Sequence, residues 1–154
     1  MTEGEVRPAG GARCGGVVRT PYVSGVIAAL LGTTDALPSQ VARAYPELAS
    51  VRWRRGGLPP RLGGWCLGAA TVSAIALGRT VWLAPGTPWD PELLLHEARH
   101  VQQWAAGWTF PLRYILESLT RGYWANRFEV DARDFAAQRL AGADHAGSPL
   151  AQDS

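Results

Sequence analysis

The sequence of 154 residues contains no lysine, only two cysteines and only three histidines. Each of these low counts limits the classes of partner, cross-link or site that the chain can have. All 15 basic residues are arginine and the net charge is only +2, so the composition does not indicate a nucleic-acid partner. We interpret the densest basic cluster as a solvated face and not as a phosphate-binding patch. This cluster consists of Arg52, Arg54, Arg55 and Arg61.

The two cysteines, Cys14 and Cys66, cannot form the disulfide framework of a small secreted domain. Because Cys14 lies in a Gly-rich lead-in, we expect free thiols and therefore a reducing compartment. The first residues are acidic where a signal peptide would be basic, and no apolar run is long enough to span a bilayer. We therefore expect a cytoplasmic protein without a membrane span.

The length suits one domain with a modest core. Residues 1–19, rich in Gly, Arg and Glu, and residues 143–154 are expected to be disordered tails. This leaves residues 20–142 as a single domain, and the first 19 residues could serve as a pro-segment.

The first half of the domain shows short apolar and alternating patterns. Gly78-Arg79 suits a tight hairpin between two strands. The expected elements are helices at 22–31 and after Pro38, a strand at 48–55, a loop at 56–64, and strands at 70–77 and 80–84.

The second half shows helical start and stop signals. Asp90 can cap a helix that begins at Pro91 and ends near Ala106 before Gly107. A second helix should run from Pro111 to about Trp124, and a third, capped by Asn126, from Arg127 to Leu140 with Gly142 as its stop. The sequence thus predicts an α+β fold: a small antiparallel or mixed three-stranded sheet, then an active-site helix and two further helices.

His96-Glu97-Ala98-Arg99-His100 lies inside the first of these three helices. Residues four apart project from one helix face, so the two imidazoles can reach one Zn²⁺. Glu97 need not bind the metal and can instead take a proton from a zinc-activated water. The pattern therefore predicts a zinc site in which Glu97 is the general base.

A third zinc ligand is needed, and the metzincin pattern is absent because its Gly and His would fall at Gln103 and Ala106. Glu129 fits best, since its helix can return past the motif helix. Glu129 could instead form a capping box with Asn126 and an ion pair with Arg133. The other candidate ligands are Glu117, Cys66 and His145.

Two segments carry a resemblance to a known family. Leu94-Leu95-His96-Glu97-x-x-His100-Val101-Gln102-Gln103, preceded by the strand at 76–83, resembles the short bacterial gluzincin-like domains of unknown function that occur in toxin and contractile-injection contexts. Gly122-Tyr123-Trp124-x-Asn126-x-x-Glu129-Val130-Asp131-Ala132-Arg133 is similar to a later segment of stand-alone members. The resemblance covers roughly residues 48–140.

The resemblance implies a zincin-like shape close to the minigluzincins, with His96, His100 and Glu129 as zinc ligands and Glu97 as general base. Larger gluzincins have an Asp four residues after the ligand Glu, where this chain has Arg133. They also have a later His or Tyr that stabilises the oxyanion. Tyr123, or less favourably Tyr114, would have to take that role.

The resulting prediction is a zinc metalloendopeptidase that hydrolyses a peptide or protein substrate. We expect the substrate to pair with an edge strand containing Val81 and Leu83, with Trp82 and Trp89 lining subsites. The alternative is a catalytically silent zinc-binding or protein-interaction module. In a latent form, Cys14 could supply the fourth zinc ligand.

Overall fold

A small mixed sheet forms the centre of the fold in the computed structural model, which describes residues 21–66 and 70–146. The strand order is β1-β2-β4-β3. β2 and β4 run parallel, whereas β1 with β2 and β3 with β4 are antiparallel. The strands are β1 Thr33–Thr34, β2 Arg52–Arg55, β3 Ala74–Leu77 and β4 Thr80–Leu83.

The α+β class is confirmed, but the prediction of three strands is wrong because β1 adds a fourth. β1 has only two residues, too few to produce an alternating pattern. The strand expected at 48–55 begins later, because residues 46–50 form the 3-10 helix η1 (Pro46–Ser50). Pro46 favours a helical first turn. Within η1, Leu48 is fully buried in the core.

The expected hairpin between β3 and β4 is present, and Gly78 adopts the positive φ that its turn requires. β4 lies inside the sheet and β3 lies at its edge. The prediction that Val81 and Leu83 belong to an edge strand is therefore wrong. The strand open for further pairing on this side is β3.

Helix α3 (Pro59–Cys66) occupies the segment expected to be a loop. Its two prolines stand at the first turn, where a missing N–H group does no harm. Its glycines permit close packing: a Cβ atom on Gly64 would lie 2.4 Å from Thr71 Cα. The glycines that suggested a loop thus let α3 approach the chain that enters β3.

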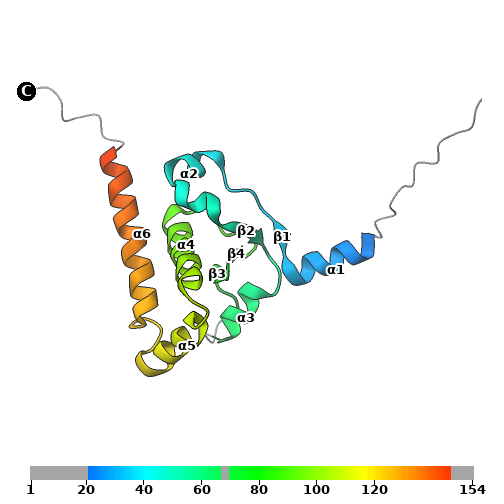
Figure 1. Ribbon diagram of the computed structural model, residues 1–154. Helices are drawn as coiled ribbons and strands as arrows, with labels where there is room; N and C mark the ends of the chain where they lie inside the picture. The colour runs from blue at the N-terminus through cyan, green and yellow to red at the C-terminus, as the bar shows by residue number, and fades with distance from the viewer. Residues whose placement is uncertain (1–20, 67–69, 147–154) are drawn as a thin grey trace, which may run out of the picture.

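Two long helices stack on one side of the sheet, as Figure 1 shows. α4 (Pro91–Ala106) packs against the sheet, and α6 (Arg127–Ala146) packs against the outer side of α4. Apolar side chains fill the space between these layers. They include Leu48, Val51, Trp53, Val81, Leu83, Leu94, Leu95, Ala98, Val101 and Ala136.

The helix starts follow the expected caps. Asp90 Oδ2 accepts a hydrogen bond from Leu93 N at 3.3 Å, and Asn126 Oδ1 accepts one from Phe128 N at 2.9 Å. α4 ends before Gly107 as expected, but α6 continues past Gly142. Gly142 does not adopt the positive φ that would end the helix. Between them, α5 spans Phe110–Arg121.

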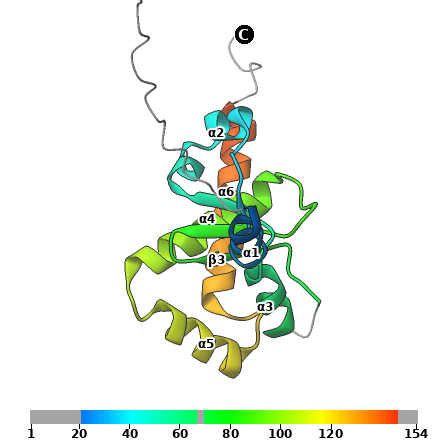
Figure 2. The same cartoon turned by 90° about the vertical axis from the view of Figure 1, so that its right-hand side faces the viewer.

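The N-terminal helices α1 (Pro21–Leu31) and α2 (Ser39–Ala44) are where the sequence places them. α1 extends away from the sheet in Figure 1, and Figure 2 shows it end-on. Arg54 donates hydrogen bonds to the carbonyls of Leu31 and Gly32, and Arg55 pairs with Asp35. Two arginines of this cluster are thus half-buried and bonded within the fold, whereas Arg52 and Arg61 are exposed.

Across residues 21–66 and 70–146, no helix combines the length and apolar character needed to cross a bilayer. The tail expected at 143–154 is wrong for residues 143–146, which belong to α6. The expectations of disorder for residues 1–19 and 147–154 fall outside the described chain.

Candidate metal centre

One turn of α4 brings the two imidazoles of the motif together. His96 Nε2 and His100 Nε2 are 3.1 Å apart, and the ring planes are nearly perpendicular, at 84°. The opposite face of this turn carries Leu95 and Ala98, which are buried in the core. Core packing of α4 therefore fixes the direction in which the histidines point.

Glu129 completes the group from the first turn of α6, where it is 1% exposed. Glu129 Oε2 lies 3.4 Å from His96 Nε2, and Glu129 Oε1 lies 3.2 Å from His100 Nε2. A tetrahedral zinc with ligand distances of about 2.0–2.1 Å separates its ligand atoms by roughly 3.3–3.4 Å. The buried His96, His100 and Glu129 group can therefore hold a metal ion.

The electrostatics of the group also suit a cation. Burial opposes ionisation of Glu129, but the neighbouring His100 and His96 imidazoles outweigh it and lower the pKa of Glu129. Glu129 Oε2 has no hydrogen-bond partner although it is buried. A buried carboxylate oxygen that faces two imidazole nitrogens is a group that a divalent ion would satisfy.

Glu97 lies beside this group without belonging to it. Burial raises the pKa of Glu97, and the nearby histidines only partly offset this effect. Its Oε2 atom is buried and has no hydrogen-bond partner. Such a carboxyl group, close to a metal site and free to bind a proton, has the properties of a general base.

His100 is oriented by a glutamine that the sequence interpretation did not single out. His100 Nδ1 lies 2.8 Å from Gln103 Oε1. Gln103 Nε2 donates hydrogen bonds to the carbonyl of Phe128 at 3.0 Å and to Asp131 Oδ2 at 2.7 Å. The carboxylate that supports His100 is therefore Asp131, two residues after Glu129, and it acts through Gln103.

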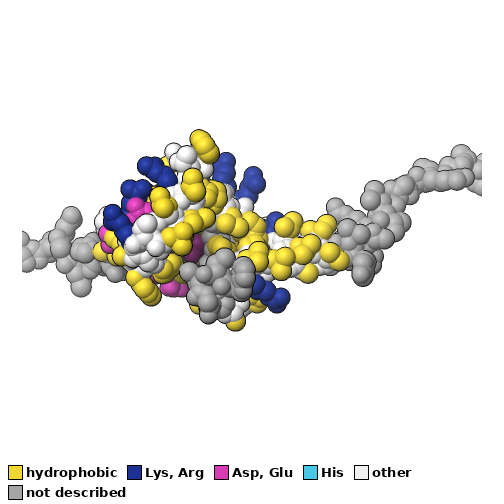
Figure 3. Space-filling model, turned by 90° about the horizontal axis from the view of Figure 1, so that it is seen from below, with side chains coloured by type: hydrophobic (Ala, Val, Ile, Leu, Met, Phe, Trp, Pro, Cys, Tyr) yellow, Lys and Arg dark blue, Asp and Glu magenta, His cyan; other side chains and the backbone are white. Residues whose placement is uncertain are grey.

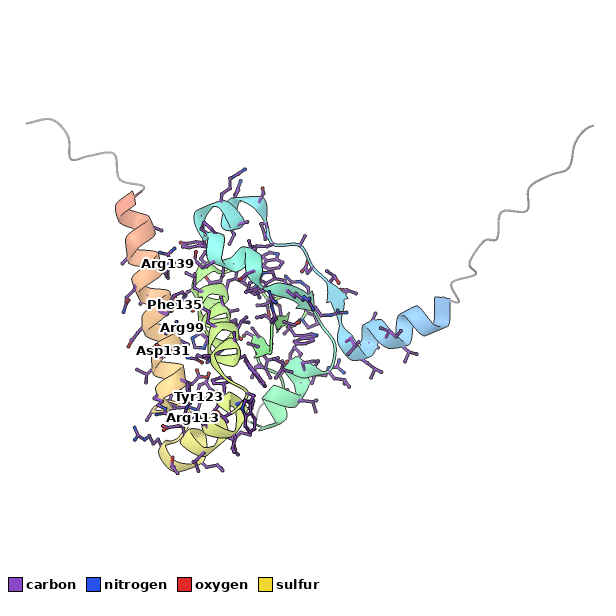
Figure 4. All side chains as sticks on the ribbon, viewed as in Figure 1. Arg99, Arg113, Tyr123, Asp131, Phe135 and Arg139 are labelled. Atoms are coloured by element: carbon purple, nitrogen blue, oxygen red, sulfur yellow. The ribbon has the colours of Figure 1, made fainter. Side chains whose placement is uncertain are left out.

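Asp131 is itself held by Arg99 of α4. Arg99 Nε and Nη2 form a bidentate pair with Asp131 Oδ2 and Oδ1 at 2.8 and 3.0 Å. Figure 4 shows Arg99 and Asp131 between α4 and α6, with Phe135 next to them. Arg99, which lies within the motif, thus connects the two helices that supply the candidate ligands.

Two tyrosines approach the centre from the side of α5. Tyr114 OH donates a 2.6 Å hydrogen bond to Glu129 Oε1 and so fixes this carboxylate. Tyr123 lines the same cleft as Glu97, and burial together with the nearby Glu129 raises its pKa. Tyr123 is therefore placed as a neutral hydroxyl donor beside the centre.

A cleft of about 970 Å³ opens onto this centre. Its walls come from the edge strand β3, from α4 and from α5, and they are mostly apolar. Trp82 and Trp89, expected to line subsites, lie elsewhere. Trp82 donates a hydrogen bond to the carbonyl of Leu31, and Trp89 packs against Trp53. Among the described side chains, Trp104 and Trp124 are the tryptophans that line the cleft.

Among the residues that the structure describes, Glu117 is the other candidate for the third ligand, and it is not part of this group. Glu117 pairs with Arg121 and Arg127. The alternative roles of Glu129 are also absent, because Arg133 Nη2 donates to the carbonyl of Trp124 and Asn126 N donates to the carbonyl of Tyr123. Cys14 and the side chains of Cys66 and His145 lie outside the described part of the structure.

No family model, curated protein or solved structure matches the chain. The assignment of a function therefore depends on the residues and geometry described above.

Proposed function

We propose that this chain is a gluzincin-like zinc metallopeptidase with a zincin-like arrangement of its sheet and motif helix. The observation that carries the proposal is the close approach of His96, His100 and Glu129, with Glu97 on the same cleft. Two imidazoles and one carboxylate are the ligand set of catalytic zinc in this class. The sequence resemblance around the motif supports the same conclusion.

Each residue has a role in the proposed hydrolysis. His96, His100 and Glu129 would hold the zinc, which when bound lowers the pKa of a water and polarises the peptide carbonyl. Glu97 would accept the proton from that water and deliver it to the leaving amine, as its buried and unpaired Oε2 atom permits. Tyr123 would donate a hydrogen bond to the oxygen that becomes negative. An extended peptide would lie along β3, the edge strand of the cleft.

The proposal is tested with zinc-loaded protein and a mixture of proteome-derived peptides, with new termini identified by mass spectrometry. We expect the wild type to contain about one zinc and to generate new termini. Glu97→Gln should retain zinc and lose cleavage by at least about a hundredfold, because the general base is absent. His96→Ala should lose the zinc.

Asp134→Asn is the matched control, since it removes an acidic side chain from the exposed surface of α6. Metal-free wild type, or undiminished cleavage by Glu97→Gln, contradicts the proposal. Bound zinc without cleavage of any peptide would instead favour the silent zinc-binding module.

A further inference from the structure

The outer face of α5 is an apolar ridge exposed to solvent. Its four aliphatic side chains are 55–80% exposed, which is unusual for residues of this size. They are Leu112, Ile115, Leu116 and Leu119. We call this set the α5 ridge.

The α5 ridge is continuous because of its spacing. Steps of three, one and three residues place the four side chains on one side of a helix. The opposite side of α5 packs inward through Phe110 and Tyr114, which contact Phe128 of α6. The ridge is therefore separate from the face that holds the helix in the fold. At 1.5 Å per residue, the ridge is about 11 Å long from its first residue to its last.

The exposed charges of the segment that carries the ridge are arginines. From residue 107 to residue 127, the exposed charged side chains are Arg113, Arg121 and Arg127. The one acidic residue in this range, Glu117, is 15% exposed and paired with Arg121 and Arg127. Figure 4 labels Arg113 on α5. Arg121 and Arg127 share Glu117, whereas Arg113 flanks the ridge, so the net positive charge of this segment suits an anionic surface.

A tryptophan lies beyond each end of the ridge. Trp108, before α5, is 90% exposed, and Trp124, after it, is 77% exposed. Figure 3, which views the molecule from below, shows hydrophobic side chains gathered over this end. Tryptophan is enriched where protein meets the headgroup region of a membrane. Exposed aliphatic, aromatic and cationic residues, the kinds found in helices that lie in the membrane interface, thus occur together in residues 108–127.

We propose that α5 docks the protein onto an anionic membrane surface, with the α5 ridge inserted among the lipids and Arg113 facing the headgroups. A second copy of the chain is a poorer occupant. A two-fold interface through the ridge would bring Arg113 of both copies to one contact, and residues 107–127 offer no exposed acidic side chain to offset them. Ile115 and Trp124 also line the cleft, so docking brings the cleft opening next to the membrane.

The test is flotation of the full chain with vesicles of phosphatidylcholine alone and of phosphatidylcholine with phosphatidylserine. We expect binding to the mixed vesicles that weakens with salt. The triple variant Leu112→Gln/Leu116→Gln/Leu119→Gln should bind at least about tenfold more weakly, because three aliphatic side chains no longer enter the lipid. Arg113→Gln should weaken binding to the mixed vesicles about fivefold and leave binding to the phosphatidylcholine vesicles unchanged.

The matched control is Val26→Gln/Ile27→Gln/Leu30→Gln, which removes three exposed aliphatic side chains from α1. This control should bind like the wild type. Circular dichroism establishes that each variant is folded. The proposal is overturned by absence of binding to the mixed vesicles, by equal loss in both triple variants, or by unchanged binding of the α5 triple variant. A dimer in light scattering that depends on the ridge, without vesicle binding, also overturns it. None of these measurements depends on peptidase activity.

Discussion

At the scale of single residues, Gln103 decides how His100 is presented. Its amide nitrogen donates to the carbonyl of Phe128 and to Asp131, so the amide oxygen must face His100. An oxygen acceptor at His100 Nδ1 requires the proton on that nitrogen. In the neutral imidazole, Nε2 then carries the lone pair and faces His96 and Glu129, which is the form that can bind a metal ion.

Gln103→Ala removes the hydrogen bond that orients His100, and it should weaken zinc binding about 10–100-fold without unfolding the protein. Titration of apoprotein with zinc against a competing chelator measures the affinity. Gln102→Ala is the control, since Gln102 is exposed and contacts Arg99 but not His100. Equal affinities of the two variants would show that Gln103 does not position the histidine.

Local sequence rules were sufficient to predict the pair of histidines in the candidate site, but not the residues that orient them. The spacing of His96 and His100 gives their common face because a helix repeats every 3.6 residues. The connection from Asp131 through Gln103 to His100 spans two helices separated by α5. Sequence spacing fixes neighbours within one helix and not the register between two helices, so Gln103 could not be identified in advance.

At the scale of elements, α3 depends on the absence of side chains at its contact with the chain before β3. Val72 N donates a hydrogen bond to the carbonyl of Pro60, which holds residues 71–72 against the helix. Gly64 faces the backbone of Thr71 at a distance that excludes a methyl group.

Gly64→Ala should therefore destabilise the protein by about 1–3 kcal/mol, because the new methyl group would collide with backbone atoms, which can move only if the helix or residue 71 shifts. Gly142→Ala is the matched change in α6, where no atom lies within 4 Å of the added Cβ. It should stabilise by about 0.5–1 kcal/mol through helix propensity. Urea unfolding measures both variants, and a neutral Gly64→Ala would contradict the packing argument.

The same two glycines explain which elements could be predicted. Asp90 and Asn126 act through hydrogen bonds within a few residues, so the starts of α4 and α6 follow from the sequence. A glycine in a helix is ambiguous, since it can end the helix or admit a close neighbour. Only the fold distinguishes these cases, which is why α3 was expected to be a loop and α6 was expected to stop at Gly142.

At the scale of the whole molecule, the candidate metal centre lies across the contact between α4 and α6. Besides the core, this contact contains the Arg99–Asp131 pair and the cation–π contact of Arg99 with Phe135. The Glu47–Arg139 pair joins η1 to the later part of α6. A metal ion bound by His96, His100 and Glu129 would connect the motif helix directly to the first turn of α6.

A metal ion that binds the folded state and not the unfolded state should therefore stabilise the entire domain. At a free zinc concentration one hundred times the dissociation constant, the gain is about 2.7 kcal/mol, or an increase in Tm of roughly 5–10 °C. Glu129→Gln should lose most of this zinc-dependent increase, because a neutral amide replaces the buried carboxylate. Glu117→Gln should retain it, since Glu117 pairs with arginines away from the histidines. Calorimetry of the apoprotein and the zinc-loaded protein gives the increase for each variant. If both variants respond to zinc like the wild type, the ion is bound elsewhere, and the two long helices are held together by their side chains alone.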